Sequence, residues 1–170
     1  MNLNEYIRDI PDFPKKGIIF KDITPLLKDR DAFAAAIKAM AEPYRKAGLT
    51  AVAAIESRGF ILGAAIALEL GIGFIPIRKP GKLPFKSRRQ QYSLEYGTDA
   101  IEIHEDAVSA GQRILLVDDV IATGGTARAA ADLLKSLGAD LVGIAFLVEL
   151  SFLGGVDKLR DEKIFSVLRY

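Results

Sequence analysis

Apolar strings rich in valine and isoleucine alternate along this chain with segments whose apolar residues recur at helical spacing. The clearest unit runs from a strand at 113–117 through a polar loop at 118–125 to a helix at 126–137, and a second strand at 141–148 completes it. Strand, helix and strand in this order are typical of a parallel sheet joined by crossover helices. The pattern predicts an α/β fold with a central, mostly parallel sheet flanked by helices.

The first half of the chain repeats this order. A helix is predicted to begin at Asp29 or Asp31, either of which can accept hydrogen bonds from the first free backbone N–H groups. A buried strand follows at 51–55, then a helix at 60–70 that is apolar on nearly all sides, then a short strand at 73–77. The apolar positions at helical spacing in the first helix are Phe33, Ile37, Met40 and Tyr44.

Hydrophobic periodicity disappears between residues 79 and 91, where prolines and a glycine interrupt regular structure. We predict a long flexible loop here, and loops of this length inside a compact domain usually have a function. Beyond it, short hairpin strands are predicted at 93–95 and 100–104. The segment has two interpretations, a solvated loop or a mobile lid that meets polyanions such as phosphates. Its basic residues form a run without an acid: Arg78, Lys79, Lys82, Lys86, Arg88 and Arg89.

The composition is that of a globular chain, since 50% of the 170 residues are hydrophobic and 26% are charged. A single α/β domain fits this length, with the first 30 residues packed over the mouth of the sheet. The absence of cysteine excludes disulfides, zinc–thiolate sites and thiol nucleophiles. No apolar run is long enough to span a bilayer and the first residues carry no secretion signal, so we expect a cytoplasmic protein without a membrane partner. A net charge of +1 gives no electrostatic footprint for nucleic acid.

The strongest chemical signal follows the strand at 113–117. Ligands of open α/β sheets bind beyond the carboxyl ends of the strands. There Asp118 and Asp119 leave the strand together, and threonine and glycine residues at 123–126 lead into a helix. Backbone N–H groups, threonine hydroxyls and the positive end of the helix could wrap a phosphate. The two carboxylates suit sugar hydroxyls or water molecules around magnesium, so the loop predicts a site for a ribose phosphate.

Other phosphate-binding motifs fit this loop less well. A P-loop needs a lysine after its glycines, and Thr126 and Ala127 stand there instead. A dinucleotide fingerprint needs G-x-G-x-x-G, which Gly124 and Gly125 do not supply. Two glycines in a tight strand-to-helix turn need no ligand at all, but that interpretation leaves the acid pair unexplained.

The loop sequence LVDDVIATGGT at 116–126 resembles the phosphoribosyl-pyrophosphate signature of the type I phosphoribosyltransferases. The resemblance covers nearly the whole chain and narrows to the adenine phosphoribosyltransferases. Its other segments are PDFP at 11–14, GIIFKDITPLL at 17–27, ESRGF at 56–60, RKPGKLP at 78–84 and YSLEYG at 92–97. The resemblance implies the type I phosphoribosyltransferase fold, with a base-binding hood at 1–30, a flexible catalytic loop at 79–97, Mg2+ as cofactor and a homodimer.

The implied reaction transfers the 5-phosphoribosyl group from phosphoribosyl pyrophosphate (PRPP) to adenine and gives AMP and pyrophosphate, a step of purine salvage. In it Asp118 and Asp119 hold the ribose hydroxyls, directly or through magnesium-bound water, and no direct metal ligand is assigned. The residues implied to cradle the 5-phosphate are Ala122, Thr123, Gly124, Gly125 and Thr126. Those implied to bind pyrophosphate are Ser57, Arg58, Gly59, Arg78 and Lys82.

The same resemblance assigns the adenine end of the site and an acid/base group. Glu95 is the one acid in YSLEYG and could assist the proton shift of the purine during attack. Adenine is implied to lie beside Ile19, Phe20 and Lys21, with backbone groups of Ile19 on its edge and Phe20 on its face. Adenine presents an amine where hypoxanthine presents a carbonyl, so a backbone acceptor can discriminate between them.

Several of these residues have a structural alternative. Arg58 could form a salt bridge with Glu56, Glu95 could hold the loop shut, and Phe20 could serve hydrophobic packing. The lone histidine, His104, is interpreted as surface structure. Two other functions compete: transfer to another base, for which the donor site would be nearly the same, and a regulatory protein that reads nucleic acid. The near-neutral charge and the lack of a DNA-binding appendage count against the second.

Overall fold

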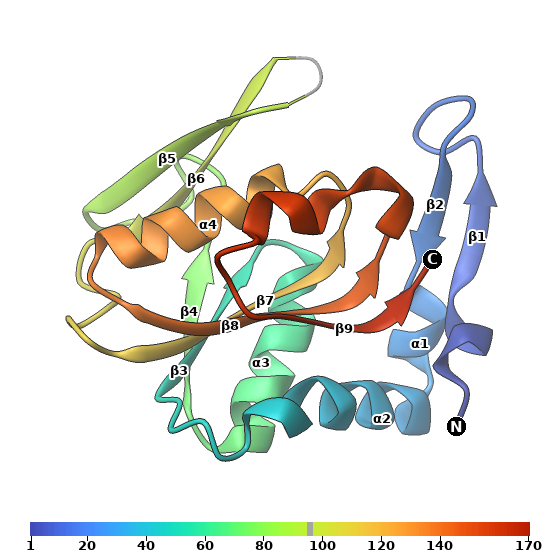
Figure 1. Cartoon of the computed structure of the whole chain (residues 1–170), viewed down its shortest axis with the longest axis horizontal. Helices are drawn as coiled ribbons and strands as arrows, with labels where there is room; N and C mark the ends of the chain where they lie inside the picture. Colours follow the sequence, from blue (N-terminus) through green and yellow to red (C-terminus); the bar gives the residue numbers. More distant parts are fainter. Residues whose placement is uncertain (95–96) are drawn as a thin grey trace.

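The computed structural model describes residues 1–94 and 97–170, and a parallel sheet lies at its centre. The sheet has five strands in the order β4-β3-β7-β8-β9, each parallel to its neighbour (Figure 1). The strands are β3 (Ala51–Ile55), β4 (Gly73–Ile77), β7 (Arg113–Ile121), β8 (Asp140–Glu149) and β9 (Ile164–Arg169). The fold class predicted from the sequence is confirmed.

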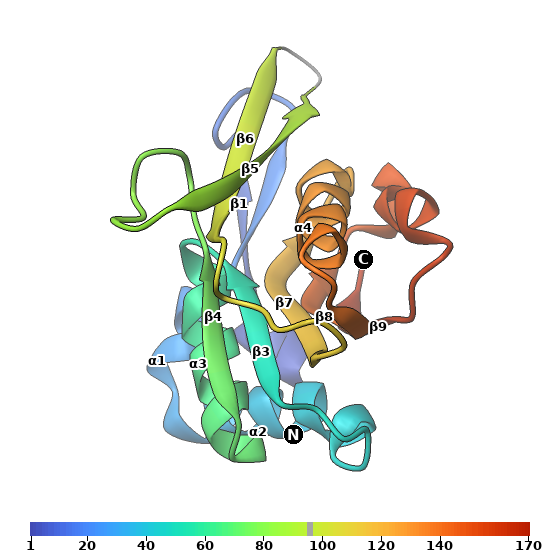
Figure 2. The ribbon, with the colours of Figure 1, turned by 90° about the vertical axis from the view of Figure 1, so that its left-hand side faces the viewer.

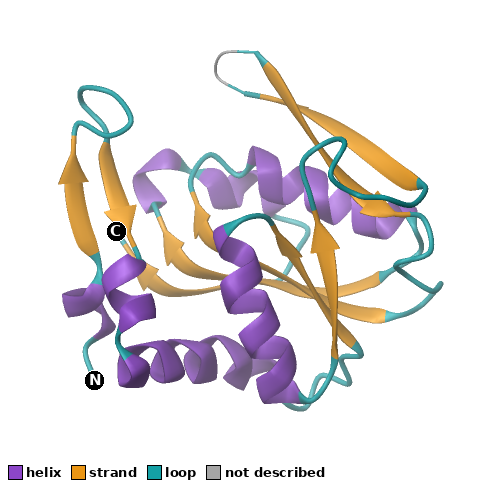
Figure 3. Cartoon of the chain, turned by 180° about the vertical axis from the view of Figure 1, so that it is seen from behind, coloured by secondary structure: helices purple, strands orange, loops and turns teal. Residues whose placement is uncertain are grey.

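Helices cover both faces of the sheet, because successive side chains of a strand point to opposite faces. Along β3, Val52 and Ala54 belong to one buried cluster, and Ala51, Ala53 and Ile55 belong to the other. The first cluster packs against α2 and α3 and the second against α4, on opposite sides of the sheet (Figure 3). The helices are α1 (Thr24–Lys28), α2 (Arg30–Ala41), α3 (Arg58–Leu70) and α4 (Gly125–Ser136). In the described ranges, none of them is long and apolar enough to cross a membrane.

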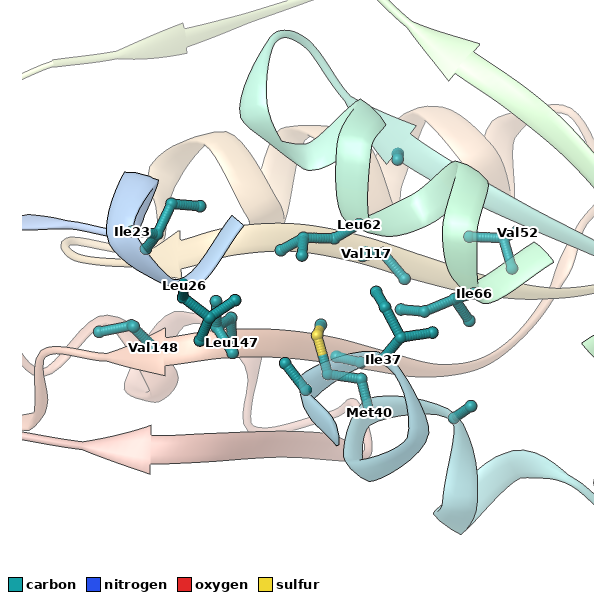
Figure 4. Close-up of a cluster of buried hydrophobic side chains, with 14 of the residues drawn as sticks. Ile23, Leu26, Ile37, Met40, Val52, Leu62, Ile66, Val117, Leu147 and Val148 are labelled. Carbon is teal, nitrogen blue, oxygen red and sulfur yellow. The ribbon is translucent and has the colours of Figure 1, made fainter. Parts of the chain in front are cut away.

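In the first cluster, the apolar residues that recur at helical spacing in the sequence lie on the buried faces of the helices. Ile37 and Met40, one helical turn apart on α2, lie near Leu62 and Ile66 of α3 in the same core (Figure 4). Burying side chains of this size stabilises the fold by on the order of 1.5–3 kcal/mol each. The start of α2 is also settled, since Asp29 accepts hydrogen bonds from the backbone N–H groups of residues 31 and 32, at 3.0 and 2.8 Å. Asp29 is therefore the N-cap.

Two antiparallel hairpins stand beside the sheet (Figures 1 and 2). One pairs β1 (Arg8–Pro11) with β2 (Ile19–Asp22), and the other pairs β5 (Ser87–Ser93) with β6 (Thr98–His104). The prediction of a loop throughout 79–91 is wrong for its last five residues, which belong to β5. β5 is polar on both faces, so its own sequence shows no alternation, whereas β6 buries Ala100, Ile101 and Ile103 and provides the ladder to which β5 pairs.

The predicted loop at 118–125 also begins too early. β7 continues through both aspartates to Ile121, because β8 extends alongside and pairs Asp118 with Phe146 and Val120 with Val148. The connection to α4 is therefore only the three residues 122–124. The short 3-10 helices are η1 (Leu3–Tyr6), η2 (Glu42–Tyr44), η3 (Ser151–Leu153) and η4 (Gly155–Leu159).

Candidate active site

A pocket of about 680 Å³ lies at the carboxyl ends of β3 and β7. This is the edge at which ligands of open α/β sheets bind. The β1–β2 hairpin supplies one wall and the segment after β8 another. Its lining residues are Ile18, Ile19, Phe20, Lys21, Ile55, Glu56, Ser57, Arg58, Lys79, Asp118, Asp119, Val120, Ala122, Thr126, Leu150 and Leu153. Most residues predicted from the sequence for the donor and the base are thus brought together.

The predicted phosphate loop forms its own small cavity of about 100 Å³ beside Asp118, lined by residues 120–127. Gly124 has a φ of +78°, which a residue with a side chain rarely adopts, and α4 begins directly after it. The backbone N–H groups at the start of this 12-residue helix carry the positive end of its dipole. A cavity of this shape at a helix N-terminus suits an anion.

The phosphate loop is braced from behind by η4, which the sequence did not reveal. A Cβ atom on Gly155 would lie 2.2 Å from the backbone oxygen of Ala122, and one on Gly124 would lie 2.2 Å from that of Gly155. The two backbones are therefore in direct contact, and only glycine fits on either side. The sequence signal for this contact is the pair Gly154-Gly155, which belongs to no known motif and was therefore not identified.

Asp118 and Asp119 lie near the carboxyl end of β7, and both line the pocket. The backbone N–H of Asp119 donates to Asp118 Oδ1 at 2.9 Å. Burial, followed by the neighbouring charge of Asp119, raises the pKa of Asp118 well above its ordinary value. Asp119 itself is buried, and its Oδ2 lies 2.7 Å from Nε of Arg58. Within the pair, Asp118 therefore has a raised pKa, and Asp119 forms an ion pair with Arg58.

Ser57 is the N-cap of α3, Arg58 and Gly59 are its first two residues, and the Glu56–Ser57 peptide bond is cis. A Cβ atom on Gly59 would lie 2.7 Å from Asp118 Oδ1, so the glycine allows α3 to begin against the acid pair. The guanidinium of Arg58 lies 4.8 Å from the centre of the Phe20 ring. The salt bridge considered for Arg58 exists, but its partner is Asp119 rather than Glu56.

Glu56 points instead toward the start of the basic segment after β4. Its carboxylate accepts hydrogen bonds from the backbone N–H of Lys79 at 2.6 Å and from Nζ of Lys82 at 2.9 Å. Nε of Arg78 lies 3.3 Å from the same carboxylate. Arg78 and Lys82 are consequently held on Glu56 and do not line the described part of the pocket. Lys79, which was predicted only as part of the basic run, does line it.

Lys79 belongs to a second cluster that ties the β5–β6 hairpin to the pocket. Its Nζ pairs with the carboxylate of Asp99, and it also donates to the hydroxyl of Tyr92 at 3.2 Å. Tyr92 in turn donates to Asp99 Oδ2 at 3.2 Å. Burial alone would lower the pKa of Lys79, but the bonds to Asp99 and Tyr92 raise it above its ordinary value. The ammonium group therefore stays charged at the pocket wall.

The base end of the pocket is largely apolar. Ile19 and Phe20 come from β2, and the Phe20 ring meets Phe13 edge to face with 5.2 Å between centroids. Leu150 and Leu153 from the segment after β8 supply another apolar wall and were missed from the sequence, since they follow the last predicted strand without any motif. Lys21 also lines the pocket, with its Nζ 2.7 Å from Asp9 and 3.9 Å from the centre of the Tyr170 ring.

Three predictions concern the rest of the basic segment and its surroundings. Glu95 lies outside the described residues, between Leu94 and Gly97, whose backbones are joined by a 2.9 Å hydrogen bond. Arg88 donates to the backbone oxygen of Ser136 at 2.7 Å, away from the pocket. His104 accepts a hydrogen bond from the backbone N–H of Phe85 at 3.3 Å, which agrees with its interpretation as a structural residue.

Comparisons with known proteins agree with this site. Residues 24–168 match the family model of the phosphoribosyl transferase domain. The adenine phosphoribosyltransferase of Thermotoga petrophila is 55% identical over 170 residues, covering 100% of both chains. A crystal structure of the enzyme of that name from Thermoanaerobacter pseudethanolicus superposes with a TM-score of 0.96 at 52% identity, covering 99% of this chain and 98% of that one. A structure of the Saccharomyces cerevisiae enzyme gives 0.93 at 39% identity, with 98% and 96% covered.

The chain therefore belongs to the phosphoribosyltransferases, and within them to the adenine phosphoribosyltransferase family.

Proposed function

We propose that this protein transfers the 5-phosphoribosyl group of PRPP to adenine, giving AMP and pyrophosphate in purine salvage. The observation that carries the proposal is the set of groups lining two adjoining cavities: an anion cradle at 122–126, the acid pair, and cations at 58 and 79. This set matches a phosphate, a diol and a pyrophosphate. The S. cerevisiae relative was crystallised with adenine and an imino-altritol bisphosphate, which supports a base and a phosphorylated sugar mimic as ligands of the family.

At the donor end, the backbone of residues 122–126 binds the 5-phosphate and the two aspartates hold the ribose hydroxyls. Ser57 and Gly59 offer backbone groups to the pyrophosphate at the start of α3, and Arg58 offers its guanidinium. Arg78 and Lys82 complete the clamp after leaving Glu56. The catalytic loop at 79–97 and the hood at 1–30 then enclose the donor and the base within one domain of 170 residues.

At the base end, Phe20 offers a face for stacking, and the backbone N–H and C=O groups of Ile19 read the edge of adenine. Lys21 stays near this wall through Asp9. Leu150 and Leu153 exclude water from the opposite side of the base. An acceptor on the protein matches the exocyclic amine of adenine and opposes the carbonyl of hypoxanthine, so the pocket favours adenine.

The chemical step breaks the bond between the anomeric carbon and pyrophosphate while a ring nitrogen of adenine attacks that carbon. The aspartates orient the ribose, and the cations stabilise the charge that develops on the leaving pyrophosphate. Glu95 is proposed to assist the proton shift of the purine. For Glu95→Gln we expect kcat to fall by about a hundredfold while PRPP affinity stays within about twofold. An unchanged kcat would leave Glu95 as a loop residue.

The acid pair fits a magnesium ion held through water. No group of three or more potential ligands occurs among the described residues, so the chain alone does not form a closed metal cage. Magnesium in proteins usually keeps several waters and binds one or two carboxylates together with substrate phosphates. Asp119 Oδ2 is buried 2.7 Å from Nε of Arg58 and accepts no hydrogen bond with good geometry from the described residues. Bound there with PRPP, magnesium would neutralise charge on the pyrophosphate.

Two further properties are proposed by resemblance. The protein works as a homodimer, which sedimentation of the purified protein measures directly. A cytoplasmic location is proposed as well.

The proposed function is tested with purified protein, PRPP and magnesium, offered adenine, hypoxanthine, guanine and xanthine in separate reactions. AMP and pyrophosphate should form with adenine, and activity should disappear with excess chelator and return with magnesium. Product from another base alone would keep the donor site and overturn the assignment of the base end. Failure with every base would contradict the transferase function.

A further inference from the structure

The three basic residues assigned to pyrophosphate are already paired with carboxylates of the same site. Arg58 lies 2.7 Å from Asp119, Lys82 lies 2.9 Å from Glu56, and Arg78 lies 3.3 Å from Glu56. A pyrophosphate that enters this end must therefore share these cations with the protein's own acids. Asp119 has a further role toward the ribose, but Glu56 has none in the mechanism derived above.

Glu56 is built into this position by the fold. It is the residue directly after β3, and its backbone N–H donates to the backbone oxygen of Ile77 at 3.0 Å. Its side chain is only 9% exposed and gathers three groups from residues 78–82, including the backbone N–H of Lys79. Although burial alone would raise the pKa of Glu56, the hydrogen bonds of Lys82 and Lys79 and the charge of Arg78 hold it below its ordinary value.

We propose that Glu56 is a positioning residue that holds Arg78 and Lys82 beside the pocket while it is empty and competes with pyrophosphate for them. The inference rests on the proposed function, because it requires these cations to bind pyrophosphate. Two anions that share one pair of cations weaken each other's binding, since each neutralises the charge that attracts the other. Glu56 thereby keeps the clamp assembled and limits how tightly the product pyrophosphate is held.

The reciprocal effect follows from linkage. If Glu56 weakens pyrophosphate binding, bound pyrophosphate must weaken the interaction of Glu56 with its cations by the same factor. The carboxylate then loses the partners that favour its charged form, and its pKa rises. This second consequence can be measured in the unmodified protein.

The first test is titration of magnesium pyrophosphate into the wild-type protein and Glu56→Gln by calorimetry. The amide keeps the size of the side chain and an oxygen for the N–H of Lys79, but removes the charge. We expect pyrophosphate to bind about three- to tenfold more tightly to the variant, the range of a partly buried ion pair. Glu42→Gln is the matched control, because Glu42 pairs with Arg45 outside the pocket lining, and it should leave the affinity unchanged.

A double-mutant cycle that combines Glu56→Gln with Lys82→Met tests whether Lys82 is one of the cations for which Glu56 competes. Lys82→Met alone should weaken pyrophosphate binding, and the gain from Glu56→Gln should shrink in its presence, because one of the two contested cations is missing. An equal gain in both backgrounds would overturn the competition for Lys82. In the wild-type protein, the 13C resonance of the Glu56 carboxyl should report a higher pKa when magnesium pyrophosphate is added.

The outcomes separate the inference from the function on which it rests. If the wild-type protein binds no pyrophosphate, the proposed function fails. If it binds pyrophosphate but Glu56→Gln binds equally or more weakly at an unchanged melting temperature, the competition is refuted. If the variant does not fold, the wild-type carbon resonance decides, and a Glu56 pKa that does not move on binding refutes the inference.

Discussion

At the proposed phosphate end of the pocket, the loop at 122–124 and the start of α4 form a cradle from backbone groups, and the backbone of η4 is packed against it. At the proposed pyrophosphate end, the cations are carried on long side chains, each paired with a carboxylate of the protein. The backbone of the cradle is held by its direct contact with η4, whereas an ion pair can exchange one partner for another. One end is thus preformed, and the other is held in a neutral state that a ligand must displace.

This contrast fits the chemistry that the two ends would perform. The 5-phosphate stays on the sugar throughout the reaction, so a permanent cradle for it has no disadvantage. Pyrophosphate is a leaving group that must depart after each turnover, and binding it too tightly would slow its release. The predictions below separate the two modes of construction, in order of expected effect.

The largest effect is expected at Asp119, where the two ends meet. Asp119→Asn removes the charged acceptor proposed for the ribose and also the partner of Arg58. Hydrogen bonds to charged groups are worth a few kcal/mol, so we expect kcat/KM for PRPP to fall by about 10- to 100-fold. Steady-state kinetics measure this, with circular dichroism to show that the fold is kept. Near-normal activity would show that the acid pair is not part of the active site.

The backbone cradle is tested with Gly155→Ala. The added Cβ would lie 2.2 Å from the backbone oxygen of Ala122, so the phosphate loop must shift. We expect ribose 5-phosphate to bind about tenfold more weakly, because the cradle loses its alignment. Gly73→Ala is the control, since its Cβ would find its nearest neighbour at 3.7 Å. Equal effects of the two changes on ribose 5-phosphate binding would show that the contact between η4 and the loop is not specific.

The side-chain end is tested with Asp99→Asn, which weakens the link from Lys79 to the β5–β6 hairpin. Partly exposed ion pairs contribute modestly, so we expect kcat to fall by about two- to fivefold, with ribose 5-phosphate affinity unchanged. Tyr92→Phe removes the hydroxyl of the same cluster and should act in the same direction. A change in ribose 5-phosphate affinity instead would place this cluster with the cradle.

The smallest effect concerns stability. The pKa of Asp118 is higher in the folded state than in the unfolded state, so wild-type stability falls as the pH rises from about 4, the unfolded value, through the folded value. Asp118→Asn carries no titrating proton and should raise the melting temperature at neutral pH by roughly 2–4 °C. The difference should shrink toward zero as the pH falls to about 4. Thermal melts between pH 4 and 8 measure it, and a variant less stable at pH 8 than the wild type would contradict the shift.

The sequence predicted the phosphate end better than the pyrophosphate end for a physical reason. The cradle and the acid pair are contiguous at 118–126, and a strand followed by a glycine turn and a helix fixes their geometry locally. The pairs of Glu56 with Lys82 and of Lys79 with Asp99 join residues that lie 26 and 20 positions apart. Local pattern identifies such residues singly but does not determine their partners.

The core strands and helices followed from periodicity, because their alternation reflects burial on one or both faces. β5 was missed because a polar strand shows no alternation until β6 is beside it. Leu150, Leu153 and Gly155 reach the site only because β8 and β9 bring the segment between them to the carboxyl end of the sheet. The pair Gly154-Gly155 is the signal within that segment, and by itself it does not indicate this position.

The most direct test of the central claim is a pair of equilibrium titrations, one with ribose 5-phosphate and one with magnesium pyrophosphate, on the wild type, Gly155→Ala and Glu56→Gln. Gly155→Ala should weaken ribose 5-phosphate binding by about tenfold and leave pyrophosphate within about twofold. Glu56→Gln should tighten pyrophosphate binding by about three- to tenfold and leave ribose 5-phosphate unchanged. If each variant shifts both ligands alike, the two ends of the pocket are not built separately and the account is wrong.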